Sequence, residues 1–187
     1  MSYKVSKQQE VFHDHYTMLK ATITHDTFSG APITVDRLAF HRGDSVAILL
    51  YEKDTDQLIL TRQFRYPTTL HKIGWMFEIP AGSMEEEEPP VACVIRETKE
   101  EVGYVIEHPQ KIAHFYPSPG ACTELCHLFY AEVTQADRTF EGGGVASEDE
   151  DIEIHKIPAQ SVSSFIKDTV IDGKTLIALQ WFLQRHG

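Results

Sequence analysis

Cysteine is scarce in this chain, and the residues that occur form no recognisable pair. Cys93, Cys122 and Cys126 are an odd number, and none stands in a C-x-x-C motif. Disulfide frameworks and zinc-finger sites space their cysteines in pairs. A zinc site built from Cys122, Cys126 and His127 is disfavoured, because no second ligand pair follows at finger-like spacing. We therefore expect reduced thiols in a cytoplasmic protein.

Positive charge and long apolar runs are also lacking. The chain carries 17 Lys and Arg residues against 28 Asp and Glu, a formal net charge of −11. This balance disfavours nucleic acid and anionic membranes as partners. No run approaches the roughly 18 apolar residues of a membrane-spanning helix, and the opening MSYKVSKQQEVF lacks the apolar region of a secretory signal. A ligand that bears phosphates must be met here by local cations or a metal ion.

Apolar residues make up 42% of the 187 positions, which is enough for a core. Short apolar or alternating runs between turn residues predict strands at 16–26, 33–42, 45–52, 58–65, 75–82, 111–116, 124–133 and 151–158. The runs at 45–52 and 58–65 are apolar on both faces, so we expect them to form a hairpin in the centre of the core. Apolar periodicity predicts helices at 89–103, 159–168 and 173–186. Many strands with one central and two terminal helices indicate an α/β fold built in layers.

The segment RETKEEVGY, Arg96–Tyr104, crowds acidic side chains onto one helical face. Glu97, Glu100 and Glu101 lie three and four residues apart, and Lys99 is the only cation inside the cluster. Like charges at that spacing repel by a few tenths of a kcal/mol per pair. One interpretation is a solvated charged face. The other is a site for a hard divalent cation, which carboxylate oxygens and substrate phosphates hold together.

The residues around this cluster match a known motif. The nudix box reads G-x5-E-x7-R-E-U-x-E-E-x-G-U, where U is bulky and apolar. Its fixed positions are filled by Gly82, Glu88, Arg96, Glu97, Glu100, Glu101 and Gly103. Thr98 and Tyr104 depart from the motif at two packing positions. The chain thus resembles the nudix hydrolases, which implies an α/β/α sandwich around a mixed β-sheet.

The flanks of the box narrow the resemblance to one branch. EIPAG precedes the box, SPGACTE follows it with Pro119, and GGGVASEDEDIEI comes later in the chain. These segments resemble the ADP-ribose pyrophosphatase and GDP-mannose pyrophosphatase branch. The resemblance implies hydrolysis of nucleoside diphosphate sugars to a nucleoside monophosphate and a sugar phosphate. It also implies a homodimer, with residues 1–42 as a dimerising strand region and 43–187 as the nudix domain.

The resemblance assigns the metal site position by position. Glu97 and Glu101 are expected as the principal ligands of Mg²⁺, with Glu100 and the carbonyl of Ala81 completing the site. Mn²⁺ is the alternative ion, because both suit oxygen ligands. Arg96 is expected to hold the glutamates in place through charge-assisted hydrogen bonds.

Substrate-binding roles carry over in the same way. Arg65 is expected to contact a substrate phosphate, although a surface salt bridge is the alternative. Glu88 is expected to support the geometry of the loop before the helix. Pro119 and Gly120 are expected to shape a wall of the substrate pocket.

The catalytic base is left open among acidic loop residues. The resemblance favours Glu148, with Glu150 as the next candidate for base or extra metal ligand. Glu124 is a third candidate, expected to face the same cleft and the substrate. The alternative for the run of acids around Glu148 is a solvated loop.

Two other functions use the same box. A nucleoside triphosphate or dinucleoside polyphosphate hydrolase lacks the EIPAG and SPG flanks seen here. A non-catalytic sensor of ADP-ribose-like ligands typically loses a box glutamate, and none is missing here. We expect the nucleoside diphosphate sugar hydrolase.

Overall fold

A computed structural model of the chain describes residues 1–145, 147 and 149–186. The chain forms two compact units, which we treat separately. The first comprises Met1–Asp44 and Tyr116–Leu125, and the second comprises Ser45–Phe115 and Cys126–Gly187. Within the described residues, no helix has the length and apolar character that crossing a lipid bilayer requires.

The first unit is built on a three-stranded antiparallel sheet in the order β1 (Tyr3–His13), β2 (Thr17–His25) and β3 (Ile33–His41). The strands predicted at 16–26 and 33–42 are confirmed. β1 lies in the strand region predicted over residues 1–42, but its own bounds were not predicted, because irregularities at Val5/Lys7 and Glu10/Phe12 break its pairing with β2. A β-bulge adds a residue and so removes the period-2 pattern from the sequence.

Residues 116–125 pack onto the end of β3. The N–H of Phe40 donates to the carbonyl of Ala121 at 2.7 Å, and the N–H of Thr123 returns to the carbonyl of Phe40 at 3.0 Å. The N–H of Leu125 donates to Asp44 Oδ1 at 3.0 Å. This segment, which the sequence did not join to the N-terminal strands, is therefore part of their unit.

The second unit contains a seven-stranded mixed sheet. Its main path runs β10 (Glu153–Pro158), β5 (Gln57–Phe64), β4 (Ser45–Glu52), β9 (Cys126–Val133) and β8 (Gln110–Phe115). The short strands β6 (Trp75–Glu78) and β7 (Ala81–Ser83) pair with β5 and β4. The β4–β9 pair is parallel, and the other pairs are antiparallel. β4 lies inside the sheet and is almost entirely buried, as its apolar run predicted.

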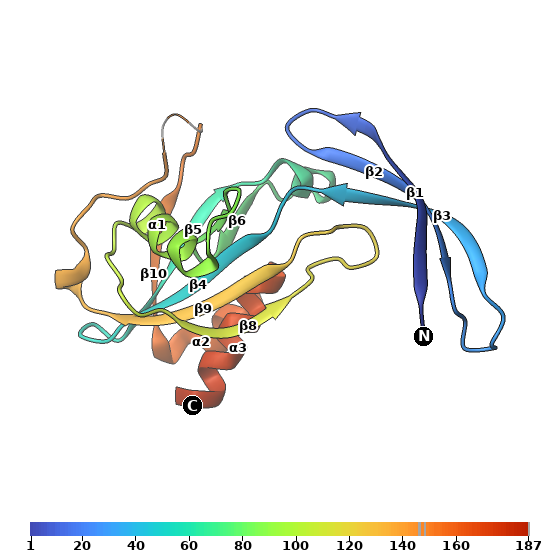
Figure 1. The fold of residues 1–187 in the computed structure, drawn as a ribbon. Helices are drawn as coiled ribbons and strands as arrows, with labels where there is room; N and C mark the ends of the chain where they lie inside the picture. Colours follow the sequence, from blue (N-terminus) through green and yellow to red (C-terminus); the bar gives the residue numbers. More distant parts are fainter. Residues whose placement is uncertain (146, 148, 187) are drawn as a thin grey trace. The chain divides into compact units, whose positions relative to one another are not determined.

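Helices cover both faces of this sheet (Figure 1). α1 (Pro90–Val102) packs through Val94 and Val102 on the face that carries Ile48. α2 (Val162–Asp168) and α3 (Gly173–His186) pack on the face that carries Leu49. Helix, mixed sheet and helix form three layers, so the predicted α/β class and α/β/α sandwich are confirmed.

The strand predicted over 75–82 is in fact two strands with different partners. Proline has no N–H for a ladder and a fixed φ, so a strand interior breaks where it stands. The break falls at Ile79 and Pro80, and the carbonyl of Pro80 accepts a hydrogen bond from the N–H of Ile48 at 2.9 Å. The chain thereby crosses from the β5 side to β4 and delivers Ala81 and Gly82 beside α1.

Candidate active site

The C-terminal end of α1 is closed by glycines. Gly103 has a left-handed φ of 79°, and its N–H donates to the carbonyl of Lys99 at 3.1 Å. The N–H groups of Gly143 and Gly144 donate to the carbonyls of Glu101 and Glu100 at 2.8 and 3.3 Å. These bonds satisfy carbonyls that a helix end leaves without partners. They also fix the glycine-rich loop directly against the acidic part of α1.

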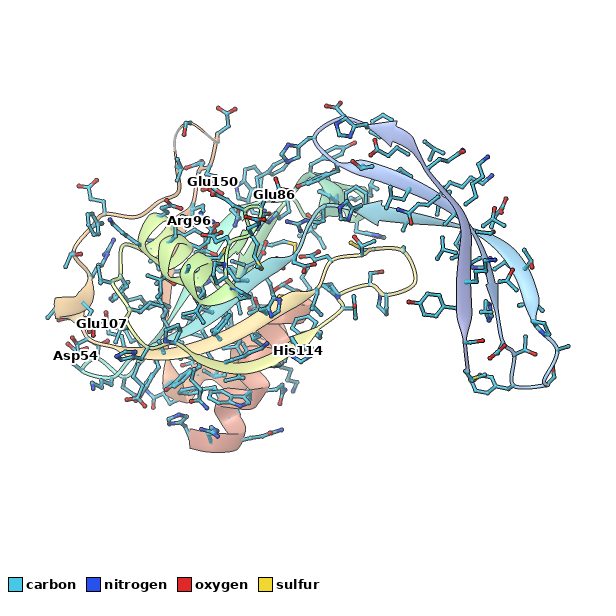
Figure 2. The ribbon with its side chains drawn as sticks, viewed as in Figure 1. Asp54, Glu86, Arg96, Glu107, His114 and Glu150 are labelled. Atoms are coloured by element: carbon cyan, nitrogen blue, oxygen red, sulfur yellow. The ribbon has the colours of Figure 1, made fainter. Side chains whose placement is uncertain are left out.

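Arg96, which Figure 2 labels on α1, donates hydrogen bonds to three glutamates at once. Its Nη1 donates to Glu97 Oε1 at 2.8 Å and to Glu100 Oε2 at 3.0 Å. Nε and Nη2 donate to the two oxygens of Glu88 at 3.1 and 3.0 Å. These bonds to Arg96 hold the pKa of Glu88 at about 2, although burial opposes the shift. These are charge-assisted hydrogen bonds of the kind expected for a positioning residue, and the roles of Arg96 and Glu88 stay predictions.

Glu97 rests against the backbone of β7 because residue 82 is glycine. A Cβ at Gly82 would lie 1.8 Å from Glu97 Cδ. No side chain can approach that closely, so any other residue here must displace the carboxylate. The glycine of the motif is therefore required by the position of Glu97.

Glu101 is buried, with 1% of its surface exposed. Its Oε2 accepts a hydrogen bond from the N–H of Ala81 at 2.8 Å. The side chains of Glu97 and Glu100 are 12% and 35% exposed. The interpretation of this face as solvated is wrong, because Glu101 and Glu97 lie against β7 and Glu100 is bonded to Arg96.

Burial and mutual repulsion make these carboxylates unusually basic. Burial raises the pKa of Glu97 to about 7, with the charges of Glu100 and Glu150 adding to the rise against the opposing effect of Arg96. Burial, opposed by the bond from Ala81 and reinforced by Glu97 and Glu150, raises the pKa of Glu101 to about 8. A bound cation would relieve this repulsion.

The donors present fit a hard divalent cation. Glu97, Glu100, Glu101 and the backbone at Ala81 offer only oxygen ligands, as Mg²⁺ and Mn²⁺ prefer. As the side chains stand, no group of three His, Cys, Asp or Glu in the described residues is arranged to hold an ion. Arg96 instead engages one oxygen each of Glu97 and Glu100. The ligand set stays a prediction.

The loop before β10 brings a further carboxylate to this cluster. Glu150 Oε2 accepts a hydrogen bond from the N–H of Val145 at 3.1 Å, and Figure 2 shows Glu150 in the segment that leads to β10. Its charge acts on both Glu97 and Glu101. Glu148, the first candidate for the base, lies outside the described residues. The identity of the base stays a prediction.

Arg65 forms a bidentate ion pair directly after β5. Its Nε donates to Glu78 Oε1 at 2.8 Å, and Nη2 donates to Glu78 Oε2 at 3.2 Å. The side chain of Glu78 is 4% exposed, so this is not the surface salt bridge considered as the alternative. Arg65 itself is 39% exposed, and its charge lowers the pKa of the buried Glu101. The predicted phosphate contact stays a prediction.

Pro119, Gly120 and Glu124 belong to the first unit, in the segment 116–125. Glu124 is largely buried there, and its Oε2 lies 3.4 Å from Nη1 of Arg42. A Cβ at Gly120 would meet nothing within 4 Å. The expected roles of these three residues in substrate binding stay predictions.

The sequence did not predict the polar cluster that Arg65 and Glu78 form with the first turn of α3. Lys174 contacts Glu78, and Asp172 accepts hydrogen bonds from Thr175. Asp172 alone could be read from the sequence, since an Asp directly before a helix is a typical N-cap residue whose carboxylate accepts from a backbone N–H of the first turn. Nothing in the sequence indicated that this turn would meet Glu78.

Comparison with known proteins agrees with this geometry. The NUDIX domain model matches residues 41–176 of the chain. The chain is 37% identical to GDP-mannose pyrophosphatase of Cronobacter sakazakii over 96% of this chain and 94% of that protein. It is also 37% identical to GDP-mannose pyrophosphatase of Citrobacter koseri, over 97% and 96%. An Enterobacter protein of the same name is 38% identical over 96% and 94%.

The chain therefore belongs to the NUDIX domain family. The predicted resemblance to nudix hydrolases is confirmed, as is the branch that contains the GDP-mannose pyrophosphatases.

Proposed function

We propose that this protein hydrolyses the pyrophosphate bond of nucleoside diphosphate sugars, with GDP-mannose as the first candidate substrate. The products are a nucleoside monophosphate and a sugar phosphate. The observation that carries the proposal is the acidic face of α1. There Arg96 donates hydrogen bonds to Glu97 and Glu100, and the N–H of Ala81 in β7 donates to Glu101. The names of the relatives support the substrate class.

Charge explains why such a face suits this substrate. A chain of net charge −11 repels a diphosphate unless cations stand at the site. Mg²⁺, when bound, supplies the charge that polarises a phosphoryl oxygen and lowers the pKa of an attacking water. The fit of Glu97, Glu100 and Glu101 to such an ion supports Mg²⁺ as the cofactor, with Mn²⁺ as the alternative.

The side chains then have distinct tasks. Arg96 holds Glu97 and Glu100, and the N–H of Ala81 holds Glu101, so the carboxylates need little rearrangement during the reaction. Arg65 binds a phosphate through the N–H groups that do not face Glu78. Glu150 or Glu148 takes the proton from the attacking water.

We further propose that the first unit forms a homodimer. β1 is exposed along its whole length, and large apolar side chains on its sheet and turns are exposed. They include Tyr3 at 78%, Phe12 at 61%, Phe28 at 100% and Leu38 at 56%. A sheet so exposed is well suited to burial against a second copy. We also propose a cytoplasmic location, with reduced thiols, because the cysteines form no recognisable pair.

A substrate panel tests this function. GDP-mannose, ADP-ribose, other nucleoside diphosphate sugars, nucleoside triphosphates and diadenosine polyphosphates are incubated with MgCl₂, and products are separated by ion-exchange chromatography. We expect GMP and mannose 1-phosphate from GDP-mannose. Preferential cleavage of triphosphates or diadenosine polyphosphates would favour the first alternative. Tight ADP-ribose binding without turnover of any substrate would favour the sensor.

A further inference from the structure

Glu52, the last residue of β4, is a buried carboxylate with three side-chain donors around it. Its exposed fraction is 0%. Lys156 Nζ lies 2.8 and 2.7 Å from its two oxygens, and Thr55 Oγ1 donates to Oε1. The hydroxyl of Tyr104 donates to Oε2. A buried charge of this kind is tolerated only while its partners stay in place, so the network resists separation of its members.

Tyr104 enters this network from a position where the nudix box departs from its pattern. The box has a bulky apolar residue there, and Tyr104 is fully buried as such a residue would be. It adds a hydroxyl, however, and a buried hydroxyl needs a hydrogen-bond partner. Glu52 supplies that partner. The departure from the box is therefore matched by a charged side chain in the core.

The acidic loop that carries Glu150 has two described limbs, residues 141–145 and 149–152. The limbs bond to each other, because the N–H of Ile152 donates to the carbonyl of Gly143 at 3.2 Å. Glu150, labelled in Figure 2, lies on the second limb. Where the two limbs are anchored therefore decides where its carboxylate lies.

Tyr104 anchors the first limb. Its backbone forms an antiparallel bridge with that of Arg138. The carbonyl of the preceding Gly103 accepts hydrogen bonds from the N–H groups of Thr139 and Phe140, at 3.0 and 3.2 Å. The chain enters the acidic loop directly after this contact, so the first limb starts from a segment that is fixed to Tyr104.

Lys156 anchors the second limb. It lies in β10, shortly after that limb ends, and pairs with Ile59 of β5. Burial alone would raise the pKa of Glu52, but its three donors hold it below its ordinary value. Burial alone would lower the pKa of Lys156, but its contacts with Glu52 and Tyr104 hold it above its ordinary value. The two side chains are therefore ionised at neutral pH, and their attraction is permanent.

We propose that Glu52 is a positioning residue: by binding Tyr104 and Lys156 at once, it fixes both limbs of the acidic loop and so holds Glu150 beside the acidic face of α1. The inference deepens the proposed function and rests on it for the use of Glu150 in the reaction. It gives a role in that reaction to the end of β4, which contributes none of the motif residues.

The test compares Tyr104→Phe with Tyr130→Phe. Each change removes from a buried tyrosine one hydroxyl that meets a carboxylate, and Tyr130 meets Glu132 at 3.5 Å on the other face of the sheet. Amide hydrogen exchange is followed by NMR in EDTA, so neither metal nor substrate takes part. The amides of Gly143 and Gly144 donate to the end of α1. We expect them to exchange about tenfold faster in Tyr104→Phe and at the wild-type rate in Tyr130→Phe.

The amide of Ile48 serves as the reference for global unfolding. It donates to the carbonyl of Pro80 inside the sheet, where exchange requires the whole unit to open. In the wild type we expect Gly143 and Gly144 to be less protected than Ile48, because the loop opens by itself. Equal protection of all three amides would overturn the proposal. Unchanged protection of the two glycines in Tyr104→Phe, with or without a change at Ile48, would also overturn it.

A Glu52→Gln, Lys156→Met double variant tests the second limb. It removes both charges together, so no unpaired charge is left in the core. We expect the same loss of protection at Gly143 and Gly144 as in Tyr104→Phe. Wild-type protection at these two amides would overturn the proposal.

Steady-state kinetics connect the network to Glu150. We expect Tyr104→Phe to lower kcat for GDP-mannose about tenfold with little change in KM, and Tyr130→Phe to change neither. In a Glu150→Gln background, Tyr104→Phe should lower kcat no further, because the carboxylate that it displaces is already gone. An equal fall in both backgrounds, or an unchanged kcat in Tyr104→Phe alone, would overturn the proposal.

Exchange measured in EDTA separates this inference from the proposed function. If the wild-type protein cleaves no nucleoside diphosphate sugar, the proposed function fails, while faster exchange at Gly143 and Gly144 in Tyr104→Phe still supports the positioning of the loop. If the wild-type protein cleaves GDP-mannose but these two amides stay protected in Tyr104→Phe, only the inference fails.

Discussion

The backbone N–H of Ala81 donates to the carboxylate of Glu101 at 2.8 Å, and this bond ties β7 to α1. The acceptor is 1% exposed and carries a pKa that burial raises to about 8. A charge-capable side chain is thus held where it is least solvated. An ionised Glu101 destabilises the folded protein unless a cation is bound beside it. Strongly shifted pKa values of this kind are common at functional sites.

Glu101→Gln should abolish most catalysis without unfolding the protein. Glutamine keeps an oxygen for the N–H of Ala81 but removes the charge that a divalent cation requires. We expect kcat for GDP-mannose to fall at least about 100-fold, with the Tm of the metal-free protein unchanged or higher. Steady-state kinetics and thermal denaturation check this, with Glu107→Gln as a control away from α1. Near-normal turnover would remove Glu101 from the metal site.

The metal-free protein should become more stable as the pH falls from about 8 to about 5.5. Burial raises the pKa of Glu97 to about 7 and that of Glu101 to about 8, above the ordinary value of 4.5. The folded state therefore binds protons more tightly than the unfolded state, and stability is lost as the pH rises through these values. Thermal melts in EDTA measure the trend.

The same two residues supply the control for that pH dependence. A Glu97→Gln, Glu101→Gln double variant should show a flatter dependence of Tm on pH, because the proton-binding groups are gone. In MgCl₂ the wild-type trend should weaken or reverse, since protons and the cation compete for the carboxylates. An identical slope in the wild type and the double variant would contradict the assignment.

Arg96→Met should leave the carboxylates that Arg96 now hydrogen-bonds without a fixed position. Glu88, Glu97 and Glu100 would lose their common donor while remaining partly buried. We expect Mg²⁺ affinity to fall about 10- to 100-fold and Tm to drop. Arg185→Met, which removes a guanidinium lying over Trp181, is the matched control. Equal Mg²⁺ affinity in the wild type and Arg96→Met, measured by titration calorimetry, would contradict the positioning role.

Gly82→Ala should impair the site by a single methyl group. The new Cβ would stand 1.8 Å from Glu97 Cδ, so the carboxylate must move. We expect weaker Mg²⁺ binding and a kcat at least about tenfold lower. Gly173→Ala adds the same group where nothing lies within 4 Å and should leave both quantities unchanged. Unaltered kinetics in Gly82→Ala would show that Glu97 is free to shift.

We expect the dimer interface to lie on the first unit. Replacing Phe12 and Leu38 with serine removes two exposed apolar side chains from its sheet. We expect light scattering coupled to size-exclusion chromatography to give twice the chain mass for the wild type and the monomer mass for the variant. A wild-type monomer would rule out the dimer, and a variant dimer would move the interface elsewhere.

Local pattern was enough for most of the fold and for the chemical class of the site. Period-2 alternation located β2 and β3, and proline and glycine bounded α1, because these preferences act between near neighbours. The acidic spacing on α1 and the motif around it also lie within a short segment. The bounds of β1 were not predicted within the expected strand region, because its bulges interrupt the alternation.

Tertiary structure decided the burial and the pKa of each acidic side chain. The sequence shows that Glu97, Glu100 and Glu101 share a face, but only the packing of β7 makes Glu101 buried and basic. The break at Pro80 turns one expected strand into two, and this is what brings Ala81 to α1. Lys174 meets Glu78 across 96 positions of sequence. Contacts over that separation depend on how whole elements pack, and no local spacing records them.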